Sequence, residues 1–123
     1  MDLWESDNAS ALETYGEIDL WDVSLITDMS ALFEGKANFN TDIYTWDVSN
    51  VTNMQSMFLD ASSFNQDISS WDVSNVTSLD EMFQSAVSFN QDLSEWDVSS
   101  AVTISGMFRF ASAFNGDIST WNV

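Results

Sequence analysis

Aspartate recurs in this chain in two sets, and the members of each set lie 25 residues apart. The first set directly follows a tryptophan and comprises Asp22, Asp47, Asp72 and Asp97. The second stands four residues before a tryptophan and comprises Asp42, Asp67, Asp92 and Asp117. A carboxylate can bind a cation, cap backbone N–H groups or contact a ligand. The first set is open to all three interpretations.

Stacking of the repeats would bring these carboxylates together. At a spacing of about 5 Å, neighbouring charges repel by about 0.8 kcal/mol in water and by about 3 kcal/mol at an effective dielectric constant of 20. Ca²⁺ is the cation that suits such a column, because it accepts carboxylate, carbonyl and hydroxyl oxygens together. Asp-x-Ser, however, also forms local turns in which the carboxylate accepts a backbone N–H. For the second set, the alternatives are an Asx-type turn and a cation site.

Catalysis has little support in this sequence. Histidine and cysteine are both absent, so the usual general base, the usual activated nucleophile and the usual transition-metal ligands are missing. Pairs of aspartates can act in glycoside hydrolysis, but every such pair here recurs in each repeat, and active sites are not usually repeated in this way. We therefore predict that the protein is not an enzyme.

The charge balance excludes several partners. Twenty acidic residues face only Lys36 and Arg109, for a net charge of −18. Binding of nucleic acid or of an anionic membrane surface requires a basic footprint, so both are excluded. No apolar run is long enough to span a membrane, and no signal peptide precedes the repeats. A cation, a basic partner or a salty medium fits this surface better.

The spacing of the tryptophans defines the domain organisation. Trp21, Trp46, Trp71, Trp96 and Trp121 mark a period of 25 residues, which is typical of stacked-repeat proteins. We predict a degenerate capping segment at 1–20, the start of a fifth repeat after residue 120, and four full repeats at 21–45, 46–70, 71–95 and 96–120. The chain stops inside the fifth repeat, so we expect a piece of a longer array whose export signal and anchor lie elsewhere.

Apolar spacing within one repeat predicts two kinds of element. The segment 43–48 reads Ile-x-x-Trp-x-Val, which indicates an extended strand with tryptophan and valine on its inner face. The segment 51–64 has apolar residues every three to four positions, which indicates a short helix or a 3₁₀ turn. The predicted fold class is an α/β solenoid, a right-handed coil with a parallel strand ladder and short convex helices or 3₁₀ turns.

Other invariant positions predict the core and the links between coils. The Trp, Val, Met/Leu and Phe columns are expected to form a continuous core. A further column is expected to hydrogen-bond the backbone of the neighbouring coil, because an amide side chain both donates and accepts. It comprises Asn40, Asn65, Asn90 and Asn115.

The repeat resembles known families. Ile-x-x-Trp-x-Val-x-x-Val-x-x-Met-x-x-Met-Phe-x-x-Ala-x-x-Phe is similar to the leucine-rich repeat of the BspA-like class. A closer resemblance is to the 25-residue repeat of bacterial and mycoplasma surface proteins, including lipoproteins. It rests on Trp-Asp-Val-Ser-Asn-Val-Thr-Asn-Met at 46–54 and Ser-Phe-Asn-Gln-Asp-Ile-Ser at 63–69, and it covers 21–123. The resemblance implies a leucine-rich-repeat-like fold, an extracellular location at the cell surface and no catalytic residues.

Two functions follow as expectations. The first is a surface-displayed module for adhesion or for binding a protein or glycan on another cell or in the matrix. Its ligand-binding face would combine the first aspartate set with the variable residues before each tryptophan, namely Thr45, Ser70, Glu95 and Thr120. The second is a structural spacer or coat element stabilised by Ca²⁺ along both aspartate columns. End-to-end self-association of the stack is a further expectation.

Overall fold

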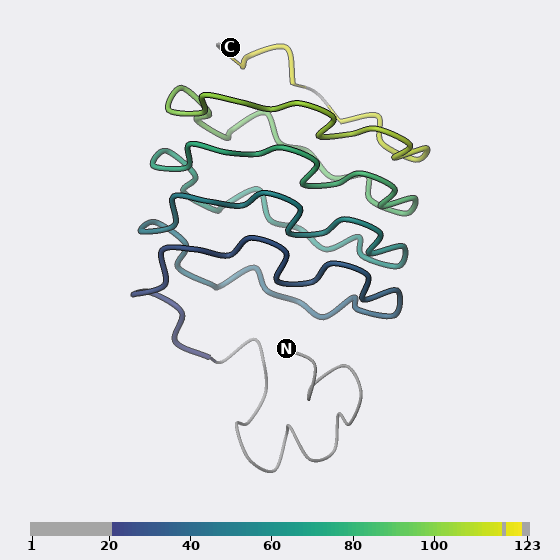
Figure 1. The fold of residues 1–123 in the computed structure, drawn as a ribbon, viewed down its shortest axis with the longest axis horizontal. Helices are drawn as coiled ribbons and strands as arrows, with labels where there is room; N and C mark the ends of the chain where they lie inside the picture. Colours follow the sequence, from purple (N-terminus) through teal and green to yellow (C-terminus); the bar gives the residue numbers. More distant parts are fainter. Residues whose placement is uncertain (1–20, 117, 122–123) are drawn as a thin grey trace.

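The chain winds into stacked coils of 25 residues each. The computed structural model describes residues 21–116 and 118–121, and consecutive coils lie above one another along the stack (Figure 1). We number positions from the tryptophan of each repeat, so coil 1 is 21–45, coil 2 is 46–70, coil 3 is 71–95 and coil 4 begins at Trp96. The predicted capping segment 1–20 lies outside the described residues and stays a prediction.

The predicted fold class is wrong. Across the described residues the chain forms no helix and no continuous strand, so there is neither a strand ladder nor a convex helix. The parallel pairing that is present consists of isolated bridges at position 8, which join Asp28 to Asn53, Asn53 to Ser78, and Ser78 to Thr103. The predicted strand at 43–48 instead contains a turn, in which the Trp46 N–H donates to the Ile43 carbonyl at 3.1 Å.

Main-chain hydrogen bonds between coils are confined to positions 7–15. In coil 2, alternate N–H groups donate to carbonyls of coil 3, each at 2.9 Å. Ser56 donates to Asp80, Phe58 to Met82, and Asp60 to Gln84. The intervening N–H groups close turns within coil 2, each to the carbonyl three residues earlier, as from Met57 to Met54 at 3.2 Å. We call residues 27–36, 52–61, 77–86 and 102–111 the main-chain arc.

Left-handed residues explain why this arc is not helical. In each coil, φ is positive at positions 11 and 15, with values between +57° and +73°. A positive φ is the conformation that a type II turn requires at its third residue, and it cannot continue an α-helix. The residues concerned are Ala31, Ser56, Glu81, Gly106, Gly35, Asp60, Ser85 and Phe110. The three-to-four-residue spacing therefore comes from consecutive β-turns, which repeat at nearly the same interval as a helix.

Side chains link the coils over the rest of the circuit. The Asn90 N–H donates to Asn65 Oδ1 at 2.9 Å, and the Asn65 N–H donates likewise to Asn40 Oδ1 at 2.9 Å. The Trp71 indole N–H donates to the Ile43 carbonyl at 3.1 Å, and the same bond recurs for Trp96 and Trp121. The predicted asparagine links are confirmed for Asn40, Asn65 and Asn90, whose side-chain oxygens each accept a backbone N–H of the next coil. We call residues 21–26, 37–51, 62–76, 87–101 and 112–116 the side-chain arc.

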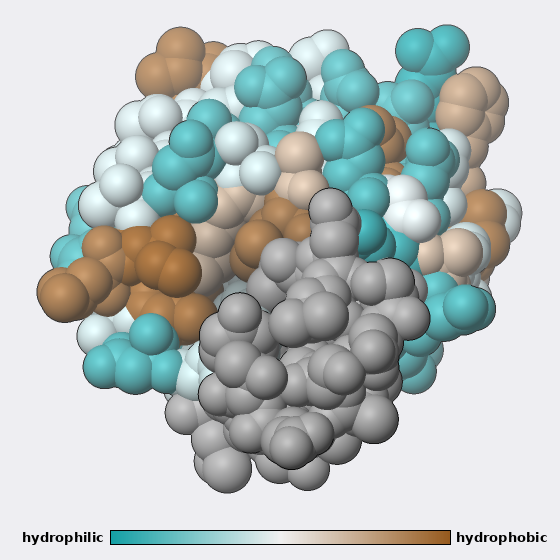
Figure 2. Space-filling model, turned by 60° about the horizontal axis from the view of Figure 1, so that its bottom comes forward, coloured by the Kyte–Doolittle hydropathy of each residue, from teal (hydrophilic) through white to brown (hydrophobic). Residues whose placement is uncertain are grey.

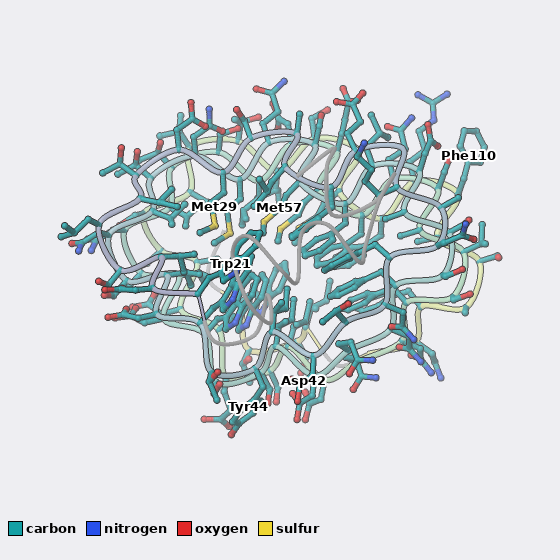
Figure 3. All side chains as sticks on the ribbon, turned by 90° about the horizontal axis from the view of Figure 1, so that it is seen from below. Trp21, Met29, Asp42, Tyr44, Met57 and Phe110 are labelled. Carbon is teal, nitrogen blue, oxygen red and sulfur yellow. The ribbon has the colours of Figure 1, made fainter. Side chains whose placement is uncertain are left out.

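The core is a set of aromatic columns. Phe58 stacks on Phe64 within its coil at a centroid distance of 4.1 Å, and on Phe83 of the next coil at 5.5 Å. Trp46 and Trp71 stack at 6.4 Å with an interplanar angle of 4°. Trp21, Met29 and Met57 point into the coil in Figure 3, whereas Asp42, Tyr44 and Phe110 point outward. The predicted Trp, Val, Met/Leu and Phe columns do form the core.

The N-terminal end of the stack mixes hydrophilic and hydrophobic surface (Figure 2). Leu25 is 87% exposed there, whereas the equivalent Asn50 donates its side-chain N–H to the Ser24 carbonyl at 2.7 Å. Within 21–116 and 118–121 no helix is long and apolar enough to cross a membrane.

Candidate interaction face

The two aspartate columns and the variable position flank one tight turn, a corner of the coil, within six consecutive residues such as 42–47. Ile43 and Trp46 are buried and joined by a tight turn, so the residues around them are pushed to the surface. Asp42 and Tyr44 project from this corner in Figure 3. We call residues 42–47, 67–72 and 92–97, together with Asp22, the acidic edge.

Each position-2 aspartate caps a local turn. The backbone N–H of Ser24 donates to Asp22 Oδ1 at 3.0 Å, and the Ser24 hydroxyl donates to the same oxygen at 2.6 Å. The backbone bond recurs at 3.0 Å in the other three members of the set, Asp47, Asp72 and Asp97. These bonds confirm that the position-2 aspartates cap turns. The second carboxylate oxygen makes none of these bonds and faces solvent with the rest of the exposed side chain.

The position-22 aspartates make Asx-type turns as well. The N–H of Tyr44 donates to Asp42 Oδ1 at 2.9 Å, and Asp67 and Asp92 accept the equivalent bond from Ser69 and Ser94. All three aspartates are exposed or half-buried at the surface. Asp117 lies outside the described residues, so its predicted role stays a prediction.

The variable position 25 lies at the surface in every coil, but it also links coils. The Ser70 hydroxyl donates to the Tyr44 carbonyl at 3.3 Å, and the Thr120 hydroxyl donates to the Ser94 carbonyl at 2.8 Å. Glu95 replaces the hydroxyl with a charge in coil 3, and Thr45 is the member in coil 1. Ligand contact at these positions, predicted from the sequence, stays a prediction.

Hydrogen bonds lower the pKa of three position-2 carboxyl groups, those of Asp22, Asp47 and Asp97. The Ser24 hydroxyl, followed by its backbone N–H, holds the pKa of Asp22 below its ordinary value. Ser49 lowers the pKa of Asp47 in the same order, although the nearby charge of Asp22 acts in the opposite direction. Donors that favour the charged form have this effect on any carboxyl group. The negative charge of Asp22, Asp47 and Asp97 is therefore favoured by the turns that they cap.

Charge is distributed unevenly around the coil. Lys36 and Arg109 stand at positions 16 and 14, inside the main-chain arc, and the acidic edge carries no basic residue. The described part of that edge holds eight acidic side chains: Asp22, Asp42, Asp47, Asp67, Asp72, Asp92, Glu95 and Asp97. Repetition from coil to coil turns them into a regular array of like charge.

The geometry gives the calcium prediction little support. Among the described residues, no three acidic side chains come close enough together to hold a metal ion. Ca²⁺ takes at least six oxygen ligands, so two or fewer acidic side chains at one place would need further oxygens to complete its coordination.

Position 8 of the repeat shows that capping of a turn does not require a charged side chain. There, Asp28 accepts the Ser30 N–H at 2.9 Å, and Asn53 accepts the Gln55 N–H at the same distance. An amide oxygen thus caps as well as a carboxylate does. Positions 2 and 22 nevertheless carry aspartate in all four complete repeats, with Asn122 only in the broken fifth. Turn formation alone does not account for the charge there.

Sequence reasoning missed several links between the coils. Asn75 at position 5 donates to the Ser49 carbonyl at 2.8 Å, and Thr77 at position 7 donates to the Thr52 carbonyl at 3.1 Å. Asp80 accepts the Thr103 hydroxyl and, at 2.7 Å, the Ser105 N–H. The recurrence of Asn and Thr at positions 5 and 7 is the signal that could have revealed the first two.

The repeat assigns the chain to a known family. Residues 5–121 match the family described as Mycoplasma protein of unknown function, DUF285. The chain belongs to this family. Searches among curated proteins and among solved structures found no match. The match supports the mycoplasma side of the resemblance in the repeat sequence, whereas the strands and helices of a leucine-rich repeat are absent from the described residues.

Proposed function

We propose that this chain is a non-enzymatic, surface-displayed binding module whose acidic edge docks a partner rich in lysine or arginine. The supporting observation is the array of carboxylates repeated in successive coils, with no basic side chain on the same edge. A regular row of like charges attracts a basic, extended segment or a basic surface, and the attraction adds up over successive coils. The similarity of the repeat to BspA-like surface proteins supports display outside the cell.

Turn capping makes the edge suitable for binding. Because each aspartate is held by the bond to the residue two positions later, the carboxylates are fixed in place before a partner arrives. Fixed groups lose little side-chain entropy on binding, so a larger share of the electrostatic attraction appears as affinity. The edge lacks exposed Trp and Arg anchors, and binding is therefore expected to weaken steeply as salt is added.

The test uses charge removal that preserves the turns. Asp47→Asn with Asp72→Asn removes two charges from the edge and keeps both oxygen acceptors, as Asn53 does at position 8. Glu34→Gln with Asp60→Asn removes two charges from the main-chain arc and is the matched control. Fluorescence anisotropy with labelled oligolysine measures binding, and circular dichroism melting checks that both variants fold.

We expect the edge variant to bind oligolysine about tenfold more weakly, equivalent to about 1.4 kcal/mol. The control variant should change affinity by less than about threefold, since its charges lie away from the edge. Equal weakening by the two variants would show that net charge rather than the edge attracts the probe. If millimolar CaCl₂ raises the melting temperature more than NaCl of equal ionic strength, the calcium-stabilised spacer gains support instead.

A further inference from the structure

Asn115 differs from the other members of the asparagine column in its C-terminal neighbour. The neighbour is Thr41 in coil 1, Gln66 in coil 2, Gln91 in coil 3 and Gly116 in coil 4. Asn115–Gly116 is the single Asn-Gly pair in the sequence. A side chain on the residue after an asparagine hinders approach of its backbone nitrogen to the asparagine amide carbon, and glycine removes that hindrance.

The earlier members of the column are also held more firmly. Asn65 Oδ1 accepts both the Asn90 N–H and the Gln91 Nε2–H, each at 2.9 Å. Asn40 Oδ1 accepts from Asn65 and Gln66 in the same way. The Asn115 side chain is exposed and has no hydrogen-bond partner among the described residues, although its backbone N–H donates to Asn90 Oδ1 at 2.8 Å. Its amide group is therefore less constrained than the others and accessible to water.

Packing requires glycine at position 116. A Cβ atom there would lie 2.5 Å from the Gln91 carbonyl oxygen and 2.8 Å from the Phe114 ring. Contacts this short do not occur, so the close approach between the backbone of coil 4 and coil 3 excludes every other residue. Thr41, Gln66 and Gln91 carry a Cβ atom at the same position of the other coils, so this close approach is local to coil 4.

We propose that Asn115 is a site of spontaneous deamidation, through a succinimide formed with Gly116. The Gly116 nitrogen attacks Asn115 Cγ and forms a new C–N bond. The bond between Cγ and the side-chain nitrogen Nδ2 breaks, and ammonia leaves with the former Gly116 amide proton. Water then opens the ring: cleavage at Cγ yields aspartate, and cleavage at the main-chain carbonyl yields isoaspartate. The net reaction takes up one water and releases one ammonia, so no other reactant is needed.

The modification would change the edge of coil 4. It adds one negative charge at position 20, two residues before the position-22 column, and isoaspartate also adds a methylene group to the main chain. The extra main-chain atom shifts the register of the residues after it. Deamidation of Asn115 would therefore make the surface more acidic and loosen the start of the next coil.

The experiment is peptide mapping by mass spectrometry after the folded chain is kept in mildly alkaline buffer. The internal controls are Asn40, Asn65 and Asn90, which share the column. We expect the Asn115 peptide to deamidate at least about tenfold faster than each of them, with isoaspartate among the products. Asn115→Gln should abolish the fast reaction. Equal rates at all four asparagines, or aspartate without isoaspartate at residue 115, would overturn the proposal.

Discussion

The two arcs of each coil are held together by different bonds, and their sequences differ accordingly. In the main-chain arc, backbone N–H and carbonyl groups join the coils, so the side chains at positions 10, 11, 14 and 15 are free to vary. In the side-chain arc, no main-chain bond crosses between the described coils, and the links come from Trp, Asn, Gln and Ser side chains. In the side-chain arc, the recurring Trp and Asn therefore supply the links between coils that the backbone supplies in the main-chain arc.

The difference also explains where function can be placed. Position 15 of the main-chain arc carries Gly35, Asp60, Ser85 and Phe110 in successive coils. Phe110 is 65% exposed, and the Arg109 Cζ atom lies 5.0 Å from the centroid of its ring. Such variation gives each coil a different surface. The two aspartate columns of the acidic edge repeat the same charges from coil to coil, and that repetition suits a partner that contacts several coils at once.

The largest expected effect results from replacement of a tryptophan in the side-chain arc. Trp71 is 4% exposed and donates its indole N–H to the Ile43 carbonyl. Trp71→Ala should lower the free energy of unfolding by about 3–5 kcal/mol. Trp71→Phe should lower it by about 1–3 kcal/mol, because the Ile43 carbonyl loses one of its two donors and the smaller ring leaves a cavity. Urea unfolding followed by circular dichroism measures both, and Glu81→Ala in the main-chain arc should stay within about 0.5 kcal/mol.

A smaller loss is expected when the asparagine column is interrupted. Asn65→Ala removes the oxygen that accepts from Asn90 and Gln91, so we expect a loss of about 1–3 kcal/mol. Gln55→Ala is the matched change in the main-chain arc, where the Gln55 backbone carbonyl accepts the link from Ala31 and the side chain is exposed. It should cost less than about 0.5 kcal/mol. Equal losses in thermal melting would remove the distinction between the arcs.

Substitutions at the left-handed residues of the main-chain arc are expected to lower the free energy of unfolding in one case and to raise it in another. Gly35 has φ +73°, and a Cβ there would meet no atom within 4 Å, so Gly35→Ala isolates the backbone strain. We expect it to cost about 1 kcal/mol. Ser56→Gly relieves the same strain at φ +58° and should raise the free energy of unfolding by up to about 1 kcal/mol. A stabilising Gly35→Ala substitution would contradict the assigned conformation.

The smallest expected effect concerns pH. The pKa of Asp47 lies below its ordinary value in the folded chain, so its contribution to stability is present above that value and is lost as pH falls through the folded pKa. Asn in Asp47→Asn caps without titrating. The melting temperature of the wild type minus that of the variant should therefore fall below about pH 4. If this signed difference rises on acidification instead, repulsion between Asp47 and Asp22 outweighs the hydrogen bonds.

The buried columns and the asparagine column of the repeat could be predicted from the sequence, whereas the backbone conformation of the main-chain arc could not. The 25-residue period and the burial of Trp, Val and Phe follow from the hydrophobic effect, which depends on residue type and spacing. The asparagine links followed from the need to satisfy turn backbone. The tandem β-turns were missed because their interval resembles that of a helix. Ala31, Ser56 and Glu81 do not reveal a positive φ by residue type, and only Gly35 and Gly106 at positions 15 and 11 hint at it.

Amide hydrogen exchange, read residue by residue by NMR in wild type and in Asn65→Ala, tests most directly the claim that separate bonds hold the two arcs. In wild type, the N–H groups of Ser56, Phe58 and Asn90 should all be protected, because each donates to a neighbouring coil. In Asn65→Ala, we predict fast exchange at Asn90 and retained protection at Ser56 and Phe58. Equal loss of protection at all three, or a Ser56 N–H unprotected in wild type, would contradict the claim.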